Sequence, residues 1–292
     1  MLAQQVANGI FIGAVYALFA IGYTLVFGVL DILNLAHAAI FTAAAFLALG
    51  FLGAHLPLPV AFLAAIVVAG VLGILLDRVA FAPLRRRKAG TLVPLISSIG
   101  VAIIIGGVLR GVYGPDELHF PAGAQFTARY HAGPFTFGVL DLTILGVAIV
   151  LMLLLSYTIR STALGRNIRA VADDRTAAAL LGVDLERTIA LTFFIASALG
   201  GAAGILIGLQ YNSVSLQMGS SIELKGLAII VLGGMGSITG AVIGALILGV
   251  VETLSVAYIS SSYRDAIAFG VMFLILVLRP SGLLGKRALR TA

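Results

Sequence analysis

The sequence predicts an all-α fold: a polytopic bundle of eight or nine transmembrane helices, one of them short or broken. Of the 292 residues, 61% are hydrophobic and 10% are charged, and the mean hydropathy is +1.14. An ordinary soluble domain carries about 25% charged residues, so these side chains could not cover a water-exposed surface. The charges are also unevenly placed, which leaves long runs without Asp, Glu, Lys or Arg; these are residues 1–30, 32–76, 89–109, 142–159, 188–222 and 226–251.

Each of these runs is expected to supply a span, because crossing the hydrocarbon core takes about 20 apolar residues. The first run has no basic residue ahead of it, so it is expected to remain as a helix and not to be cleaved as a signal peptide. The second is long enough for two helices and is divided by the sequence HLPLP at 55–59. In chain order the expected spans are 5–30, 35–54, 58–82, 92–112, 139–159, 188–210, 237–258 and 264–279, with a short piece at 223–234.

Lysine and arginine concentrate in three clusters, which together hold 14 of the 18 basic residues. The clusters are Arg78, Arg85, Arg86, Arg87 and Lys88; Arg160, Arg166, Arg169, Arg175 and Arg187; and Arg279, Lys286, Arg287 and Arg290. The positive-inside rule places all three in the cytoplasm, together with the loops 83–90 and 160–187 and the C-terminus. The loop 115–138 is then external, and the net charge of +6 reflects membrane topology and not a nucleic-acid partner.

Crossing parity constrains the segment between the last two clusters. An even number of spans must join two cytoplasmic clusters, whereas only three obvious helices lie there. The piece 223–234 is expected to cross as a short half-helix that lines a cavity, because unsatisfied backbone is tolerated only away from lipid. This gives nine spans, or eight if two segments merge. Three spans before the first cluster place the N-terminus outside, and residues 1–292 are expected to form one transmembrane domain.

Two glycine stripes follow four-residue spacing. On a helix, this spacing gives a smooth face along which another backbone can approach closely. The stripes predict helix packing within the chain, or packing against a second membrane subunit, at Gly200, Gly204, Gly208, Gly236, Gly240 and Gly244.

Signatures of catalysis and nucleotide binding are missing from the sequence. There is no G-x-x-x-x-G-K-[ST] loop, and the run GGMGSITG lacks both the spacing and the preceding strand of a dinucleotide site. No His pair has metal-ligand spacing, no Ser, His and acid form a hydrolytic set, and the chain contains no cysteine. We therefore expect neither an enzyme nor a bound cofactor or metal.

One segment gathers charge in the middle of the apolar chain. Residues 165–188, GRNIRAVADDRTAAALLGVDLERT, hold eight of the thirty charged residues (18 basic, 12 acidic). Asp173 or Asp174 can cap a short helix that Gly182 ends, and Asp184 can cap the next span. The helix would show Ala177, Ala178, Leu180 and Leu181 on part of its surface. It is either a solvated connector or a docking helix for a cytoplasmic partner.

This segment, residues 165–188, resembles the coupling loop of ABC-importer permeases, whose motif is E-A-A, three residues, then G. The chain reads TAAALLG at 176–182, with Thr176 in place of the motif's Glu. Further segments resemble the H-type permease of branched-chain amino acid ABC transporters, in the same order and at matching intervals. They are 9–41, 78–87 (RVAFAPLRRR), 95–100 (LISSIG), 181–193, 232–253 (LGGMGSITGAVIGALILGVVET) and 279–285 (RPSGLLG).

The resemblance implies a subunit of an importer in the bacterial inner membrane. Such a permease pairs with a second, related permease, sits on two cytoplasmic ATP-binding subunits and receives solute from an external binding protein. The missing nucleotide loop fits this arrangement, because ATP is hydrolysed on another chain. Coupling to the ATPases would then fall to Arg166, Arg169, Asp173, Asp174, Arg175, Ala177, Ala178, Leu181, Gly182, Asp184 and Arg187.

Polar residues inside the spans are candidates for the solute pathway. An ionisable group at mid-bilayer costs about 2.5–3.5 kcal/mol on insertion scales, so each needs a reason. Lys225 and Glu252 either pair with each other between helices or line the path, and Asn34 and His37 are either caps and interhelical bonds or pathway groups. The full set of candidates is Asn34, His37, Ser97, Ser98, Gln210, Asn212, Lys225 and Glu252.

Four interpretations stay open at the level of sequence. The first is an importer permease for branched-chain amino acids, and the second is the same machine for urea, short amides or other amino acids. A self-sufficient secondary transporter would need paired carboxylates or a proton relay at mid-membrane, where the chain offers only Glu252. A non-transporting membrane scaffold would bind partners through residues 160–187 without moving solute.

Overall fold

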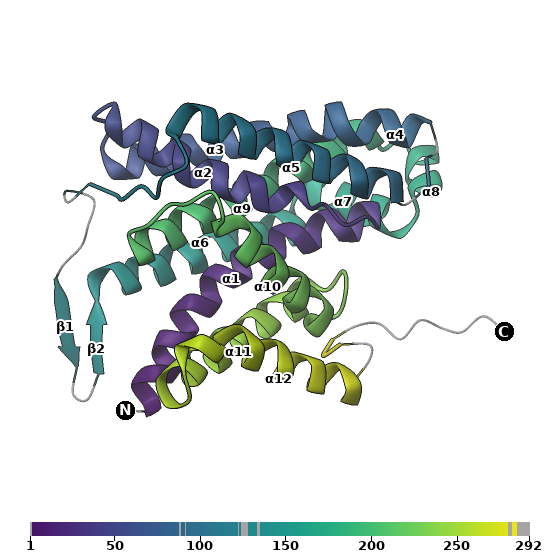
Figure 1. Ribbon diagram of the computed structural model, residues 1–292. Coiled ribbons are helices and arrows are strands. Elements are labelled where there is room, and N and C mark those ends of the chain that lie inside the picture. The colour runs from purple at the N-terminus through teal and green to yellow at the C-terminus, as the bar shows by residue number, and fades with distance from the viewer. Residues whose placement is uncertain are drawn as a thin grey trace.

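The computed structural model describes residues 2–87, 89–90, 92–121, 123, 128–132, 135–279 and 282–284. Lys88, Lys286, Arg287 and Arg290 of the basic clusters lie outside the described residues, as do parts of the expected external loop and of 279–285. The helices are α1 (Leu2–Leu30), α2 (Ala36–Gly53), α3 (Leu58–Leu76), α4 (Ala82–Arg86), α5 (Leu92–Tyr113), α6 (Val139–Ser161), α7 (Ala163–Asp173), α8 (Arg175–Leu180), α9 (Leu185–Tyr211), α10 (Met218–Gly233), α11 (Ile238–Tyr258) and α12 (Arg264–Leu278) (Figure 1).

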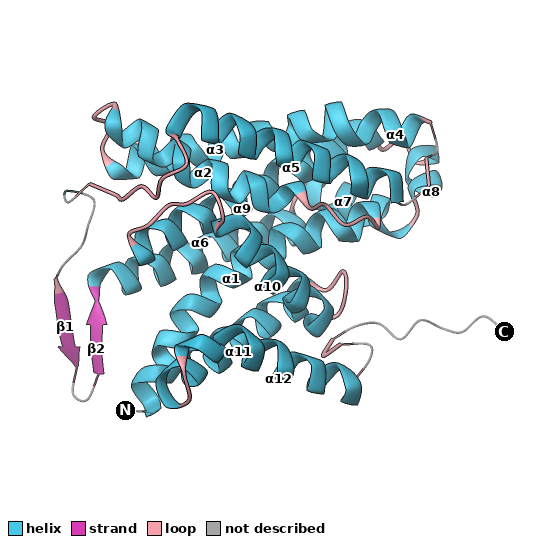
Figure 2. Cartoon of the chain, in the orientation of Figure 1, coloured by secondary structure: helices cyan, strands magenta, loops and turns pink. Residues whose placement is uncertain are grey.

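The predicted all-α fold is confirmed. Eight helices are long and apolar enough to cross a membrane, and a short antiparallel hairpin, β1 (Arg129–Ala132) with β2 (Phe135–Gly138), is the strand structure of the described chain (Figure 2). A π-helical turn, Asp77–Phe81, joins α3 to α4, so that Leu58–Arg86 forms one continuous span. α10 has 16 residues, about 24 Å of helix, and is shorter than the hydrocarbon core. The described residues therefore contain eight helices long enough to span a membrane and, in α10, an apolar helix too short to do so.

α1 and α9 form the centre of the bundle. In the most apolar window of each helix, 83% of α1 and 78% of α9 is buried, compared with 17% of α5, 17% of α6 and 6% of α12. α1 packs on α9 and α11, and α2 and α3 also pack on α9. The outer helices present apolar side chains, as expected of surfaces that face lipid or another membrane subunit.

Close helix contacts explain most of the predicted glycine stripes. A Cβ at Gly204 would collide with the carbonyl group of Phe41, and one at Gly240 would collide with the backbone of Gly233. Gly200 faces the His37 ring. Gly208 packs against Phe120 and Val214, and Gly244 packs against Ile229.

Gly236 departs from the predicted stripe. It lies before α11, in a turn with φ of +83°, and has open space where a Cβ would be. The helix begins only after Ser237, whose hydroxyl accepts a hydrogen bond from the backbone N–H of Gly240. Gly236 thus serves the turn, which needs a left-handed residue, and does not serve helix packing.

The bundle has two distinct ends, which we name by their elements. At the hairpin end, the β1–β2 hairpin lies beside the N-terminal turn of α1, where Gln4 exchanges hydrogen bonds with the backbone of Thr136. At the charged end lie α4, α7 and α8 (Figure 1). α10 and the loop before it connect the two ends: Val214 pairs with Leu118 at the hairpin end, and Leu232 accepts a bond from Leu283, just after α12.

Candidate functional site

The charged island, residues 160–187, folds into two short helices instead of the single one expected. Thr162 caps α7, and Asp174 caps α8 by accepting bonds from the N–H groups of Thr176 and Ala177. Asp173 is the last residue of α7. Gly182, with φ of +84°, ends α8, and Asp184 caps α9. α7, α8 and α9 thus each begin after a residue whose side chain accepts a hydrogen bond from the first turn of the helix.

α8 presents a small apolar surface, which we call the α8 knob and define as Ala177, Leu180 and Leu181. The two leucines are 85% and 83% exposed. Ala178, expected on the same surface, is buried at 2% exposure and belongs to the core. The difference arises because α8 has only six residues, so one of its faces must rest on the bundle. Exposed leucines of this kind, surrounded by charge, are typical of contact sites for another protein.

Arginines fasten the island to the membrane helices. The guanidinium of Arg175 donates to the carbonyl oxygen of Val29, near the last turn of α1, at 2.8 Å. Arg169 bonds to the carbonyl of Ile159 in α6 and makes no ion pair with Asp173, which the sequence placed one turn away. Burial, and then the neighbouring Arg85, lower the pKa of the Arg175 guanidinium. Arg166 and Arg187 are exposed. These bonds attach α7 to α6 and the start of α8 to α1.

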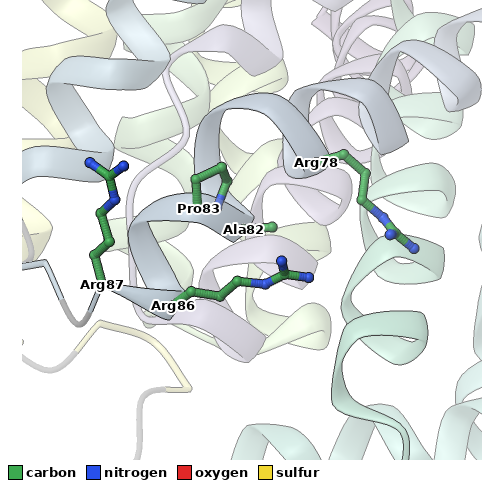
Figure 3. Close-up of a pocket in the computed structure, with 5 residues that line it drawn as sticks. All are labelled: Arg78, Ala82, Pro83, Arg86 and Arg87. Carbon is green, nitrogen blue, oxygen red and sulfur yellow. The ribbon is translucent and has the colours of Figure 1, made fainter.

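The first basic cluster forms a cavity of about 390 Å³ at the charged end, lined by Arg78, Ala82, Pro83, Arg86 and Arg87 (Figure 3). Arg86 forms a forked pair with Glu186 at the start of α9, with N–O distances of 2.8–3.0 Å. The sequence indicated only topology for this cluster. The structure adds a direct link between the loop 83–90 and the charged island.

The neighbouring Arg85 stabilises the π-helical turn. Its guanidinium donates to both carboxylate oxygens of the buried Asp77, at 2.5 Å and 3.2 Å. A bidentate pair of this kind is stronger and more directional than a single hydrogen bond. The span α3 and the basic loop after it are thus held in one orientation.

A second cavity, of about 150 Å³, opens between α2, α5 and α10, and we call it the α10 cavity. Most of its lining is small or aliphatic. The lining residues are Leu35, Ala38, Ala39, Thr42, Ala102, Ile105, Gly106, Leu109, Leu216, Gly219, Ser220 and Glu223. Glu223 is the one ionisable side chain among them, and its Oε1 atom is buried without a hydrogen-bond partner in the described chain.

None of the eight pathway candidates from the sequence lines the α10 cavity. Ser98 lies beside it, where its hydroxyl accepts a bond from the N–H of Leu35, and Ser97 is half-buried in the same turn of α5. Asn34 and His37 are buried in the core, and no side-chain hydrogen bond of normal geometry reaches either.

Two candidates stabilise the hairpin end. Gln210 donates to Asp141 in the first turn of α6. Asn212 ends α9 in the left-handed conformation and binds the backbone N–H of Phe120. These positions join the loop after α5 to the end of α9.

Lys225 and Glu252 meet in a buried ionic network. Lys225 Nζ lies 2.7 Å from Glu252 Oε1 and 3.0 Å from Asp265 Oδ1. Arg264 also pairs with Glu252, and the hydroxyl of Tyr16 donates to the same carboxylate oxygen at 3.1 Å. The network ties α1, α10, α11 and α12 together with two positive and two negative charges. It was only partly visible in sequence, because its partners come from four segments.

The chain is similar over nearly its whole length to known permeases. Residues 5–276 match the family described as the permease component of the branched-chain amino acid transport system. The high-affinity branched-chain amino acid transport system permease protein LivH of Escherichia coli (strain K12) is 36% identical, with 97% of this chain and 95% of LivH covered. LivH of Salmonella typhimurium (strain LT2) has the same identity and coverage. BraD of Pseudomonas aeruginosa, a permease protein with the same description, is 34% identical over the same shares. No solved structure matches the chain.

Proposed function

Because the chain belongs to the family of branched-chain amino acid permease components, we propose that it forms half of the translocation path of an ABC importer for aliphatic amino acids. The observation that carries this proposal is the match to LivH and BraD over 97% of the chain. In this proposal the second half of the path is a related permease, two ATP-binding subunits dock on the cytoplasmic side, and an external binding protein delivers the solute.

The charged island is the proposed docking site for the ATPases. The α8 knob is exposed, capped at both ends and joined through Arg175 to the end of α1. Movement of a docked ATPase would displace α8, and the short, rigid connections would pass that displacement to α9. The forked pair of Arg86 with Glu186 extends the same surface to the loop 83–90.

The α10 cavity is the proposed section of the path that this chain supplies. Its walls of Ala, Gly, Ile and Leu suit an aliphatic side chain. A path that is only weakly attractive also lets the solute leave again, as conduction requires. In this arrangement the binding protein would set most of the selectivity.

The orientation that agrees with this function places the charged end in the cytoplasm and the hairpin end outside. The arginines of the first two clusters lie on α4, α7 and α8, on the turns next to α4, in the last turn of α6 and in the first turn of α9. The positive-inside rule then assigns the side.

Uptake in proteoliposomes tests the function directly. The complex would contain this chain, a second permease, the ATPases and the binding protein, with ATP inside and labelled leucine outside. Leucine uptake that requires ATP and this chain, and that valine blocks, is the expected result. If only urea or glutamate displaced the label, the substrate class would be a different one from aliphatic amino acids. The absence of flux from an assembled complex would contradict the proposal.

A further inference from the structure

The N-terminal half of α10 exposes polar groups that lipid would not tolerate. Ser220 and Ser221 are exposed and Glu223 is half-buried, all within the first six residues of a helix too short to span the bilayer. Polar groups at membrane depth occur where they line a water-filled cavity or face another protein. The α10 cavity, which Ser220 and Glu223 line, is such a place.

Glu223 is not neutralised by the chain itself. No basic side chain lies within 4.0 Å of it in the described residues, because the nearby Lys225 pairs with Glu252 and Asp265. The cavity hydroxyls do not reach it either. Thr42 donates to the carbonyl of Ala38, and Ser220 donates to the carbonyl of Gln217. One carboxylate oxygen of Glu223 is left buried without a donor.

A buried acceptor without a donor is costly, so a ligand that brings a donor gains from binding there. Much of the remaining lining is apolar and comes from α2 and α5, with Ala38, Ala102, Ile105 and Leu109. The volume of about 150 Å³ is sufficient for a small apolar group, since a cavity of about 150 Å³ engineered in another protein holds benzene. The cavity thus combines one negative group with one apolar surface of side-chain size.

We infer that Glu223 is a transit site for the α-ammonium group of the passing amino acid, whose aliphatic side chain lies against α2 and α5. This inference rests on the proposed function and deepens it, because it favours solutes with an ammonium group over neutral ones such as urea. The ammonium donates to the Glu223 carboxylate in a charge-assisted hydrogen bond. The site stays weak because the cavity is open on one side, and Glu223 remains partly exposed.

The test uses the complete importer complex in proteoliposomes. Glu223→Gln keeps the shape of the side chain and removes its charge, Glu223→Asp restores the charge, and Ser221→Ala is the matched control on the exposed face beside the cavity. The measured quantities are leucine uptake per ATP hydrolysed and the stimulation of ATPase activity by the loaded binding protein.

Glu223→Gln is expected to keep stimulated ATPase activity within about twofold of wild type and to lower leucine uptake per ATP by about tenfold, the loss typical of a hydrogen bond to a charged group. Glu223→Asp should recover most of the uptake, and Ser221→Ala should match wild type. Uptake by Glu223→Gln within twofold of wild type would overturn the inference, and so would equal losses in Gln and Asp variants that also lose ATPase stimulation.

A labelling experiment covers the case in which Glu223→Gln does not assemble. The chain has no cysteine, so Ser220→Cys, on the cavity lining beside an intact Glu223, carries a unique thiol, and Val112→Cys on the exposed face of α5 reports the background. A water-soluble cationic thiol reagent should modify Ser220→Cys, and turnover with leucine should slow this reaction several-fold. Equal labelling with and without leucine would overturn the site.

The wild-type complex separates the two proposals. If the wild-type complex moves leucine and substitution of Glu223 has no effect on uptake, the ammonium site alone is overturned. Wild type that moves urea and not leucine keeps the importer and overturns the ammonium site. Wild type that moves no solute overturns both.

Discussion

Glu252 is fully buried, and groups from three other helices converge on its carboxylate: Lys225 from α10, Arg264 from α12 and Tyr16 from α1. Lys225 has a second acidic partner in Asp265, whereas the further hydrogen bond of Arg264 among the described residues is to the neutral hydroxyl of Tyr211. Removing one partner of a buried pair leaves an uncompensated charge, which is worse than removing both. Within this network, replacing Glu252 is therefore expected to cost the most stability.

Glu252→Gln is expected to destabilise the folded chain by about 3–5 kcal/mol, more than Lys225→Met, because it strands Arg264 and leaves Lys225 with Asp265 alone, whereas Lys225→Met leaves Glu252 paired with Arg264. The double variant Lys225→Met with Glu252→Gln should lose less than the sum of the two single changes. The loss of stability is measured as the shift in the midpoint of thermal unfolding in detergent, with size-exclusion chromatography as the readout. Additive losses would show that the pair is not coupled.

A second residue-scale prediction concerns the tight approach of α9 to α2. Gly204→Ala places a Cβ against the carbonyl of Phe41 and should cost about 1–3 kcal/mol through overpacking. Gly107→Ala in α5, where a Cβ meets open space, is the control and should be neutral or stabilising by about 1 kcal/mol. Equal unfolding midpoints for the two variants would contradict the close contact.

At the scale of elements, α8 is too short to be stable alone, so its caps and the core beneath it must hold it. Its buried side carries Ala178, and its exposed side carries the α8 knob. A protein that docked on the α8 knob would contact its exposed side chains without displacing the buried Ala178.

Leu180→Ser with Leu181→Ser should abolish co-purification of the ATPases while leaving the unfolding midpoint of the chain unchanged. The reason is that both side chains are more than 80% exposed and contribute to contact with a partner, not to the core. The matched control is Leu153→Ser with Leu154→Ser, an exposed leucine pair on α6, which should retain the ATPases. Retention by the α8 variant would place docking elsewhere.

At the scale of the whole molecule, the structure separates a hairpin end from a charged end, and the absence of cysteine makes their sides measurable. Asp116→Cys and Ser262→Cys, both exposed, should react with a membrane-impermeant maleimide in intact cells. Leu181→Cys should react only after permeabilisation, because the arginines hold that end in the cytoplasm. The reverse pattern would invert the proposed orientation.

Local sequence was sufficient to predict the fold class, the approximate bounds of the long spans and the presence of a short helix at α10. These features depend on consecutive residues: apolar runs, the proline-containing break at 55–59, and caps such as Asp174 and Asp184. The sequence also indicated the family, because the motifs that carry the resemblance are local strings.

The rotation of each helix and the pairing of distant segments depend on packing in three dimensions and could not be predicted from local sequence. Rotation explains why Ala178 is buried, why Gly236 serves a turn, and why none of the eight pathway candidates from the sequence lines the α10 cavity. Partners far apart in the chain, such as Tyr16 with Glu252 and Arg86 with Glu186, are joined only by packing. Glu223 was overlooked for the same reason: its free carboxylate matters only because α2 and α5 leave a cavity in front of it, and local sequence does not encode that arrangement.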